Sequence, residues 1–584
     1  MITKTYIKRL IGFPLVTALM APLASCSDFL DIKSQSEIVL EDFWSEKSDV
    51  DNIVAGCYTG LMSDAVVRRM IIWGEGRSEN LQVGPRIVDD VNLERILNEN
   101  ITAINPYTSW DGFYSIINRC NTVIKYAPSV AATDPGYTES ELRANIAEVS
   151  ALRDLCYFYL IRTFRDVPYS TEAYIDDDQP MNLPATPFYD VLDSLINDLE
   201  SIKNDAVAYY PETKPKYQTG RITQTAIHAM LCEMYLWKKD YDNCVRYADL
   251  VIDFLKQKYE DKKKQSGRTL SGQTAAEYRV NGYPLEVDMS SSSYGLPYEN
   301  IFVDGNSQET IFEIFFADET TGGAYNTAVS ALYGHQSNQS ALMSASETVT
   351  EDIDKKAHVI FAERNKEFDA RMYEWCDAST GDIRKFVCRS ITIMSQNNTV
   401  RASEGSKFPE KTNGSKWVIY RLPDIMLLKA EALTQKLREG SDAEVVDYNK
   451  PILEQCFNLV NAINKRSILK GTQDLKEDTL LASAYMSKAQ MEELVMLERQ
   501  RELMFEGKRW YDLVRRSLRD GNTDVLTTAA MKRKGINAQY VRSFLKKEDA
   551  IFWPYNNEEM KVNKNLVQNP SFGSGENESY EKTK

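Results

Sequence analysis

The sequence contains little histidine and no clustered cysteine, which argues against the commonest protein metal sites. It has three histidines and nine cysteines among 584 residues. The histidines are His228, His335 and His358, none of which lies near a cysteine at zinc-ligand spacing, and no CxxC pair occurs. Histidine-based chemistry therefore has little material, and we expect neither a metal nor a cofactor.

The chain also lacks an excess of positive charge. Its formal net charge is −16, from 69 Lys and Arg against 85 Asp and Glu. A nucleic-acid surface needs clustered Lys and Arg to displace phosphate counterions, so we expect no nucleic-acid partner. A neutral ligand such as a sugar stays compatible with this balance. Gly and Pro are not enriched, which indicates an ordinary globular protein rather than a disordered one.

Motifs of common hydrolases and nucleotide-binding enzymes are absent as well. The chain contains no G-x-S-x-G, H-E-x-x-H or P-loop pattern. Acidic runs such as Asp89-Asp90 and Asp176-Asp177-Asp178 are usually solvated loops rather than paired catalytic carboxylates. We therefore expect no hydrolase activity.

A long apolar run occurs at the N-terminus only. Lys4, Lys8 and Arg9 precede the apolar segment from Ile11 to Leu23, as in an export signal. The following L-A-S-C fits the lipoprotein pattern, in which residues 1–25 are removed and Cys26 is lipidated. An unlipidated secreted protein is the alternative. Residues 26–40 would then form a tether to a membrane, and no later segment is long and apolar enough to span one.

The eight other cysteines are scattered. Cys156 and Cys232 lie inside apolar helical runs, where a buried free thiol is the commoner outcome. The pairs Cys232–Cys244 and Cys376–Cys388 could instead be disulfides in an exported protein. The sequence leaves both alternatives open.

Helical periodicity dominates the first half of the mature chain. Residues 107–126 carry an i, i+3, i+4, i+7 apolar stripe, and we expect Pro128 to end this helix. A longer helix begins at Glu139 and is apolar nearly all round from Leu155 to Ile161, so neighbours should enclose it. A further helix is predicted from about Thr186 to Lys203.

One stretch, from Thr223 to Leu255, has the spacing of a tetratricopeptide repeat. Its pattern is carried by Leu231, Tyr235, Tyr241, Cys244, Ala248 and Val251. Helix–turn–helix units recur at Trp417–Gln435 with Val446–Arg466, and at Lys488–Arg516. Because one such unit cannot bury its apolar faces alone, we expect the units to stack into one curved, mostly α-helical scaffold.

The region from 256 to 416 differs from the rest. It has poor helical periodicity, many Ser, Thr, Gly and Asn residues, and short strand-like runs such as ETIFEIFFA. We divide the mature chain into a helical part (41–255), this irregular lobe (256–416) and a second helical part (417–584) within one compact unit. Irregular insertions on a rigid scaffold often hold binding sites. Candidate ligand-binding rings there are Tyr283, Tyr294, Tyr298, Tyr325 and Tyr333.

The segment LERQRELMFEGKRWYDLVRR (497–516) combines many arginines and carboxylates with apolar residues. Three helical-spacing pairs are predicted within it, namely Glu498–Arg501, Glu506–Arg509 and Asp512–Arg515/Arg516. Gly507 would let the chain bend. We interpret this stretch as structural, and we expect Trp510 and Asp512 to help hold the helices together. Glu502, Glu506 and Arg509 should be at least half buried and paired within the scaffold.

Motifs from one end of the chain to the other resemble the SusD/RagB family of outer-membrane nutrient-binding lipoproteins of the Bacteroidetes. They lie at Leu23–Asp31, Glu41–Trp44, Trp110–Asn121, Ala147–Pro168, Tyr420–Ala432, Ile463–Ser467, Leu497–Arg516 and Trp553–Pro570. The family often has Gly at the positions of Asp166 and Ser571, which are local turn positions.

This resemblance implies a SusD-like fold of stacked tetratricopeptide-like helical hairpins with a loop-rich lobe, and no catalysis. It also implies an outer-membrane, lipid-anchored, cell-surface protein that caps a SusC-like TonB-dependent transporter and delivers oligosaccharides. By resemblance, the segment before the Trp110 helix contributes ligand contacts, which points to Trp73, Arg77 and Asn80. The alternatives are a RagB-like peptide-binding member and a repeat scaffold that binds only a protein.

Overall fold

The computed structural model describes residues 43–573, apart from positions 177, 266–279, 288–292, 295, 318–324, 335–340, 351–368, 378–379, 387–390, 397–398, 405–413, 469–479 and 534. The predicted signal (1–25), tether (26–40) and lipidation site Cys26 lie outside the described residues. Among the helices of the described part, none combines the length and the apolar character that crossing a bilayer would require.

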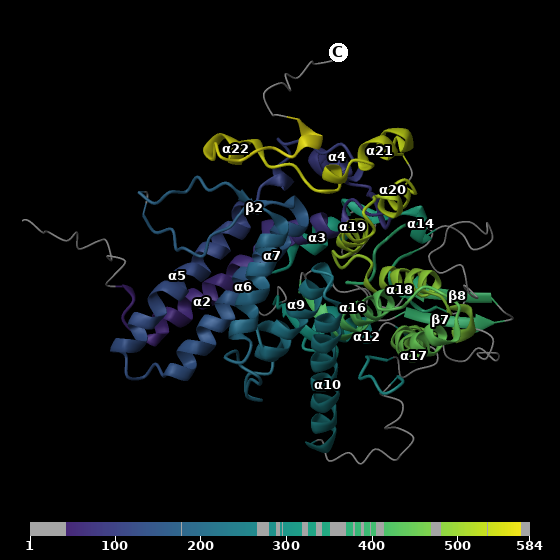
Figure 1. Cartoon of the computed structure of the whole chain (residues 1–584), viewed down its shortest axis with the longest axis horizontal. Coiled ribbons are helices and arrows are strands. Elements are labelled where there is room, and N and C mark those ends of the chain that lie inside the picture. Colours follow the sequence, from purple (N-terminus) through teal and green to yellow (C-terminus); the bar gives the residue numbers. More distant parts are fainter. Residues whose placement is uncertain are drawn as a thin grey trace, which may run out of the picture.

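Long helices stack side by side through the molecule, each packed against the next in chain order (Figure 1). The fold is mostly α-helical, as predicted. The stacked helices are α2 (Lys47–Leu61), α5 (Asp111–Thr133), α6 (Glu139–Phe164), α7 (Phe188–Ile202), α9 (Gln224–Trp237), α10 (Tyr241–Gln265), α16 (Leu422–Gln435), α17 (Ala443–Arg466), α18 (Lys488–Leu503) and α19 (Arg509–Asp520). Helix α16 packs against α10, α17 and α18, and so joins the two helical parts.

Helix α6 shows why the sequence forms these elements. Thr138 caps its N-terminus, and Glu141 returns a hydrogen bond in a capping box. From Ala147 to Phe164 the side chains are buried on all faces, because α2, α5 and α7 pack around them. The predicted enclosure of the segment from Leu155 to Ile161 is therefore confirmed.

Two predicted boundaries are wrong. Pro128 lies inside α5 instead of ending it, because Pro128 faces solvent, where water can satisfy the carbonyl that loses its partner, while Ala127 and Val130 stay buried. The segment Trp417–Arg421 is a strand, β9, and its helix begins only at Leu422. Proline near the start of α16 fits the first helical turn, whose N–H groups have no helical partner.

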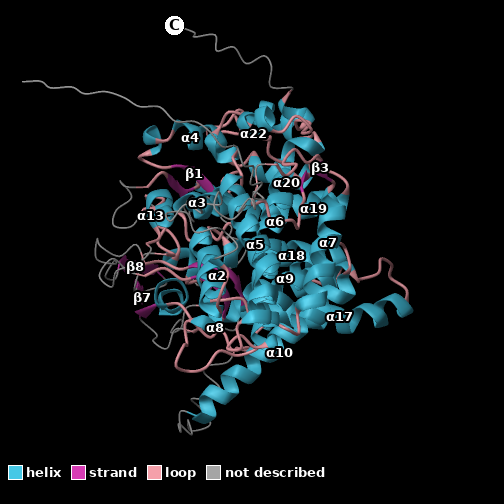
Figure 2. Cartoon of the chain, turned by 90° about the vertical axis from the view of Figure 1, so that its left-hand side faces the viewer, coloured by secondary structure: helices cyan, strands magenta, loops and turns pink. Residues whose placement is uncertain are grey.

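The described strands form four small sheets, and in Figure 2 the labelled strands β1, β7 and β8 lie on the left of the molecule and β3 on the right. Strand β5 (Thr310–Ile314) lies in the predicted run ETIFEIFFA and pairs antiparallel with β9. The other pairings are β1 (Leu81–Val83) with β6 (Met343–Ala345), β2 (Val167–Pro168) with β3 (Ala185–Thr186), and β4 (Ser293–Tyr294) with β7 (Ile391–Gln396) and β8 (Thr399–Glu404). Pairs β1–β6 and β5–β9 tie the irregular lobe to the helical parts.

The C-terminal segment returns to the N-terminal part of the chain. After α20 (Asp524–Ala530) and α21 (Ala538–Leu545), the Trp553 N–H donates to the Thr163 carbonyl at 2.8 Å. The Asn557 N–H donates to the Ala103 carbonyl at 2.8 Å. These bonds bring α22 (Asn557–Val562) to the same end of the molecule as α4 (Val91–Leu97).

The cysteine pairing left open by the sequence is partly resolved. Cys232 and Cys244 are buried free thiols with their sulfurs 3.7 Å apart, well beyond an S–S bond of about 2 Å. Cys156 and Cys376 are buried free thiols as well. Cys388 lies outside the described residues, but the free thiol of Cys376 argues against the Cys376–Cys388 disulfide.

Candidate functional site

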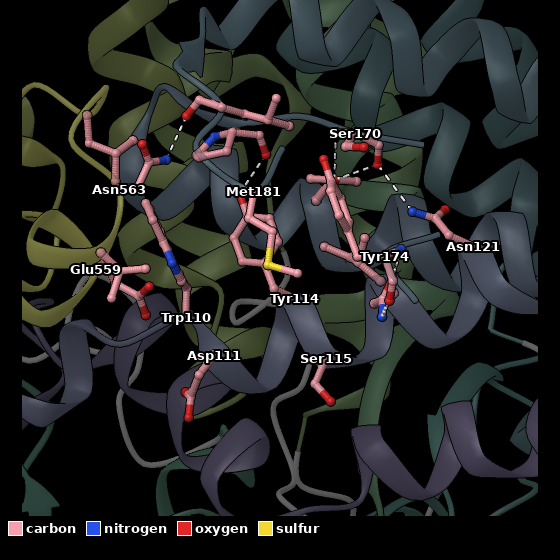
Figure 3. A pocket seen from close by; sticks show the side chains of 17 residues that line it. Trp110, Asp111, Tyr114, Ser115, Asn121, Ser170, Tyr174, Met181, Glu559 and Asn563 are labelled. Carbon is pink, nitrogen blue, oxygen red and sulfur yellow. Dashed lines mark hydrogen bonds between the residues drawn. The ribbon is translucent and has the colours of Figure 1, made fainter. Parts of the chain in front are cut away.

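A pocket of about 500 Å³ opens between the N-terminal part of α5, the segment 168–183 and α22 (Figure 3). Its walls come from positions that are far apart in the sequence. The lining residues are Trp110, Asp111, Tyr114, Ser115, Ile117, Asn118, Asn121, Tyr157, Pro168, Ser170, Tyr174, Met181, Leu183, Glu559, Val562, Asn563 and Leu566.

One face of α5 forms the floor of the pocket. Trp110, Tyr114, Ile117 and Asn121 recur at spacings of three and four residues, which place their side chains on the same side of a helix. Trp110 is only 4% exposed, because its ring packs edge-on against Tyr114 at 5.5 Å and contacts further aromatic rings. The floor is therefore rigid and largely aromatic.

Hydrogen bonds hold the segment 168–183 as a fixed wall. Asn118 donates to the Tyr174 carbonyl at 2.8 Å and accepts from the Tyr174 N–H at 2.7 Å. The Tyr157 hydroxyl donates to the Ser170 carbonyl at 2.8 Å and accepts from its N–H at 3.0 Å. Because these bonds act at two points, the wall keeps its position relative to α5.

The opposite wall is tied to the same segment. Asn563, just after α22, donates to the Leu183 carbonyl at 2.7 Å. The Tyr555 hydroxyl donates to the Asp166 carbonyl at 2.6 Å. The C-terminal segment therefore closes one side of a pocket whose other sides are built from the N-terminal part.

The charged groups of the pocket are both carboxylates, Asp111 and Glu559. Asp111 is exposed, whereas Glu559 is partly buried. Burial raises the pKa of Glu559 above its ordinary value, a hydrogen bond from Trp110 opposes this, and the Asp111 charge adds to it. In chemical terms the site offers aromatic and aliphatic surface together with hydrogen-bond acceptors. The described residues hold no group of three His, Cys, Asp or Glu side chains arranged to bind a metal.

Three residues predicted to contact a ligand lie in the core, so the structure corrects that prediction. Trp73, Arg77 and Asn80 have none of their surface exposed. Trp73 donates to the Tyr107 carbonyl at 2.8 Å, Arg77 forms an ion pair with Glu99 at 2.8 Å, and Asn80 donates to Glu75 at 2.7 Å. A side chain without exposed surface cannot touch a ligand; all three hold the scaffold together.

The five tyrosines that were predicted to bind ligand differ in how exposed their side chains are. Tyr298 and Tyr333 are buried, 5% and 2% exposed, and pack against other aromatic rings, so their proposed ligand contact is also corrected. Tyr283 and Tyr325 are partly exposed, and their role stays a prediction. Tyr294 belongs to β4, but its side chain lies outside the described residues.

The stretch around Glu502 forms a buried network of charges. Glu502 pairs with Arg421 at 2.6 Å, with Arg371 at 3.0 Å and with Arg466. Burial raises the pKa of Glu502, but these guanidinium groups outweigh it and leave the pKa below its ordinary value. Glu506 pairs with Arg421 and with Lys385, each at 2.6 Å. None of these residues lines the pocket, and the network joins α18 to the strand β9 and the irregular lobe.

The predicted burial and pairing of Glu502, Glu506 and Arg509 are confirmed, with exposures of 0%, 3% and 9%. The expected Glu506–Arg509 pair is replaced by long-range partners, since α18 ends at Leu503 and α19 begins at Arg509. Arg509 binds Glu79 at 2.6 Å instead.

The remaining two residues of this stretch are buried as well. Trp510 is 1% exposed and donates to the Ile551 carbonyl at 3.1 Å. Asp512 pairs with Arg499 at 2.9 Å and with Arg515 at 2.8 Å. Both residues therefore contribute to the packing of the scaffold, the structural role that was predicted for them.

Sequence reasoning missed the residues that line the pocket. The helical stripe that contains Trp110 and Asn121 was visible, but nothing marked Tyr174 or Glu559 as its neighbours. One signal was available: the tail W-P-Y-N-N-E-E-M contains both Tyr555 and Glu559, a ring and a carboxylate on the returning segment.

Comparisons with family models cover most of the chain. A model described as "SusD family" matches residues 308–572, and a model described as "Starch-binding associating with outer membrane" matches residues 28–236. The SusD-like protein P38 of Formosa agariphila is 24% identical over 506 residues, which cover 86% of this chain and 90% of that protein. A SusD-like protein of Bacteroides ovatus is 28% identical over 44% of each chain.

Solved structures share the fold. A SusD superfamily protein from Bacteroides fragilis superposes with a TM-score of 0.61 at 16% identity, over 90% of this chain and all of that one. Another, from Bacteroides thetaiotaomicron, gives a TM-score of 0.57 at 20% identity, over 91% of this chain and 99% of that one. Both alignments run across the helical parts and the irregular lobe alike.

Proposed function

The chain belongs to the SusD/RagB family, and from this premise we propose that it is a cell-surface lipoprotein that captures an oligosaccharide and delivers it to a SusC-like TonB-dependent outer-membrane transporter. The observation that carries the proposal is the order of the two family models, which follow one another along residues 28–236 and 308–572. The description of one of them associates the family with starch binding and with the outer membrane.

The pocket beside α5 is the proposed binding site. A pyranose presents a C–H face that packs on aromatic rings, while its hydroxyls form hydrogen bonds at the ring edge. Tyr114 and Tyr174 supply rings, and Glu559 and Asp111 supply acceptors within the same pocket. Its volume of about 500 Å³ lies in the range usual for ligand sites.

Anchoring follows from the sequence pattern. Lipidation of Cys26 would attach the folded part to the outer membrane through the tether 26–40. Comparing membrane fractionation of the full chain with that of a Cys26→Ala variant tests this part of the proposal. The variant should lose membrane attachment, and unchanged attachment would refute it.

The proposal excludes catalysis. Glycosidases use two carboxylates that face each other across the scissile bond. Asp111 is instead largely exposed and accepts a hydrogen bond from the Ser109 hydroxyl at 2.8 Å. Chromatography of oligosaccharides after long incubation with the protein should show intact ligand, and the appearance of cleaved products would overturn this part.

Binding is tested with the folded part that begins after Cys26. Calorimetric titration against plant, host and fungal oligosaccharides and against peptide mixtures should find a saccharide ligand. A Tyr174→Ala variant should bind it at least about tenfold more weakly, because the variant lacks an aromatic ring on which the C–H face of a pyranose can pack. Tyr540→Ala is the matched control, since Tyr540 is exposed in α21 and does not line the pocket.

Two alternatives remain distinguishable in the same experiment. Binding of peptides without any saccharide would favour a RagB-like peptide-binding member. Binding of neither, together with retention of a protein partner in pull-downs from the outer membrane, would favour a helical scaffold that binds only a protein. A saccharide ligand together with co-purification of a TonB-dependent transporter would support the proposed function.

A further inference from the structure

Three asparagine side chains of the pocket donate hydrogen bonds within the protein. Asn118 donates to the Tyr174 carbonyl at 2.8 Å, and Asn563 donates to the Leu183 carbonyl at 2.7 Å. Asn121 donates to the Ser170 and Glu172 carbonyls, at 3.3 and 2.9 Å. Each of the three amides therefore uses at least one N–H on the wall of the pocket, and Figure 3 shows the bonds of Asn121 and Asn563.

The lining tyrosine hydroxyls of α5 and α6 are used in the same way. Tyr114 donates to the Pro168 carbonyl at 2.6 Å, and Tyr157 donates to the Ser170 carbonyl at 2.8 Å. Each hydroxyl has a single proton, so a ligand can use these groups only as acceptors.

The pocket contains acceptors but no cation. Its lining residues include the carboxylates of Asp111 and Glu559 and no Lys, Arg or His. Glu559 lies beside Trp110 (Figure 3). An ionised carboxylate accepts hydrogen bonds and cannot donate them. Both charged groups of the lining are therefore negative and act as acceptors.

Two nearby arginines already have carboxylate partners, and that of Arg69 is Asp111 of the pocket. Arg69 lies 3.8 Å from Asp111, and its guanidinium donates to the carbonyls of Ser109 and Pro106 at 2.6 and 3.0 Å. Arg153, which donates to the Asn121 oxygen at 3.0 Å, also pairs with Asp154 and Asp198. Neither arginine lines the pocket, and each is held by the partners named above.

From these contacts we propose that the pocket accepts saccharides without acidic groups and rejects uronated or sulfated ones, with Glu559 as the residue that discriminates. This inference rests on the proposed function and names the substrate class of its site. Sugar hydroxyls and amino groups can donate to Glu559. A carboxylate or sulfate finds no cation in the lining and faces like charge beside the partly buried Glu559.

The test compares oligosaccharides that differ only in charge. Oligogalacturonates and their neutral methyl esters of equal length are titrated into the folded part that begins after Cys26, with glucosamine oligomers as the cationic probe. We expect the oligogalacturonate to bind at least about tenfold more weakly than its neutral counterpart, and the glucosamine oligomer to bind no more weakly than a neutral glucan of equal length.

Variants separate a charge effect from a change of shape. Glu559→Gln keeps the side-chain volume and removes the charge, so it should reduce the discrimination against the oligogalacturonate by several-fold. Glu558→Gln is the matched control, because Glu558 lies on the same helix, its side chain is 76% exposed, and it does not line the pocket. Thermal unfolding should confirm that both variants fold like the parent protein.

The outcomes distinguish the inference from the proposed function. Equal or tighter binding of the oligogalacturonate to the parent protein would overturn the inference and leave saccharide capture standing. Equal effects of Glu559→Gln and Glu558→Gln would overturn the role of Glu559. If no saccharide bound and peptides did, the proposed function itself would be refuted.

Discussion

The backbone of Gly74 lies directly against the backbone of Gly507. A β-carbon on Gly74 would be 1.8 Å from the Gly507 carbonyl oxygen, far inside any permitted contact. Gly507 itself has φ +69°, and a β-carbon there would be 2.8 Å from the Met70 carbonyl oxygen. Next to this contact, the Glu75 carboxylate accepts from the Phe505 N–H at 3.2 Å. Helix α3 (Asp64–Glu75) is thus joined to the turn between α18 and α19.

Substitution of either glycine should therefore weaken the scaffold. For Gly74→Ala we expect a loss of at least about 3 kcal/mol in the free energy of unfolding, because two backbone segments must separate. Urea unfolding followed by tryptophan fluorescence measures it. Gly56→Ala is the control. Gly56 lies in α2 with open space where a β-carbon would be, so alanine there should raise the free energy of unfolding by about 0.5–1 kcal/mol. A neutral Gly74→Ala would contradict the close contact.

The buried charge network should be sensitive to loss of one cation. Arg421 has no exposed surface and contacts Glu502 and Glu506, each at 2.6 Å. Replacing it with Leu leaves both buried carboxylates without one of their cationic partners, so we expect a loss of about 3–5 kcal/mol in the free energy of unfolding. Arg421→Lys should recover little of this, because lysine cannot bind two carboxylates through a planar fork.

A surface pair provides the comparison for Arg421. Arg86 and Asp89 are 2.5 Å apart, with side chains 56% and 49% exposed. Arg86→Ala should change the free energy of unfolding by less than about 1 kcal/mol. Similar losses for Arg421→Leu and Arg86→Ala would show that burial of the network adds nothing.

Asp512 should contribute to the acid sensitivity of the fold. Burial raises its pKa, but Arg499 and Arg515 outweigh this and lower the pKa from 3.8 to about 2. A group whose folded-state pKa is lowered stabilises above the unfolded pKa, and this contribution is lost as the pH falls through the folded pKa. Between about pH 4 and pH 2 the free energy of unfolding of the parent protein should therefore fall by about 2 kcal/mol more than that of Asp512→Asn. The variant lacks the carboxylate and so has no such contribution to lose. Unfolding free energies that run parallel in this window would contradict it.

The helices could be predicted from the sequence because their causes are local. The capping box of Thr138 and Glu141 and the apolar positions from Leu155 to Ile161 lie within a few turns of each other. Pro128 could not be judged in this way, since its tolerance depends on which face of α5 meets solvent. Local pattern fixes where helices form, and packing decides where some of them end.

Partners that lie far apart in the chain could not be predicted. The sequence analysis paired Glu506 with Arg509 at helical spacing, whereas the fold places Arg421 and Lys385 around Glu506 and Glu79 beside Arg509. The pocket has the same origin: Tyr114, Tyr174 and Glu559 meet only because the C-terminal segment returns to α5. The tyrosine-rich lobe drew attention by its composition, yet Tyr298 and Tyr333 are buried.

The wall of the pocket should depend on Asn118. Its side chain holds the Tyr174 backbone through two hydrogen bonds, at 2.8 and 2.7 Å, so Asn118→Ala leaves both backbone groups without that partner. We expect a cost of about 1–3 kcal/mol that falls mainly on the segment 168–183, because α5 itself keeps its packing. Amide hydrogen exchange of peptides from this segment should accelerate at least about tenfold, while peptides from α16 stay unchanged, and affinity for the saccharide should fall in parallel. Asn145→Ala is the matched control, since Asn145 makes an exposed bond to Asp51 at 3.3 Å. Uniform acceleration across the whole chain would show that Asn118 supports the scaffold as a whole rather than this wall.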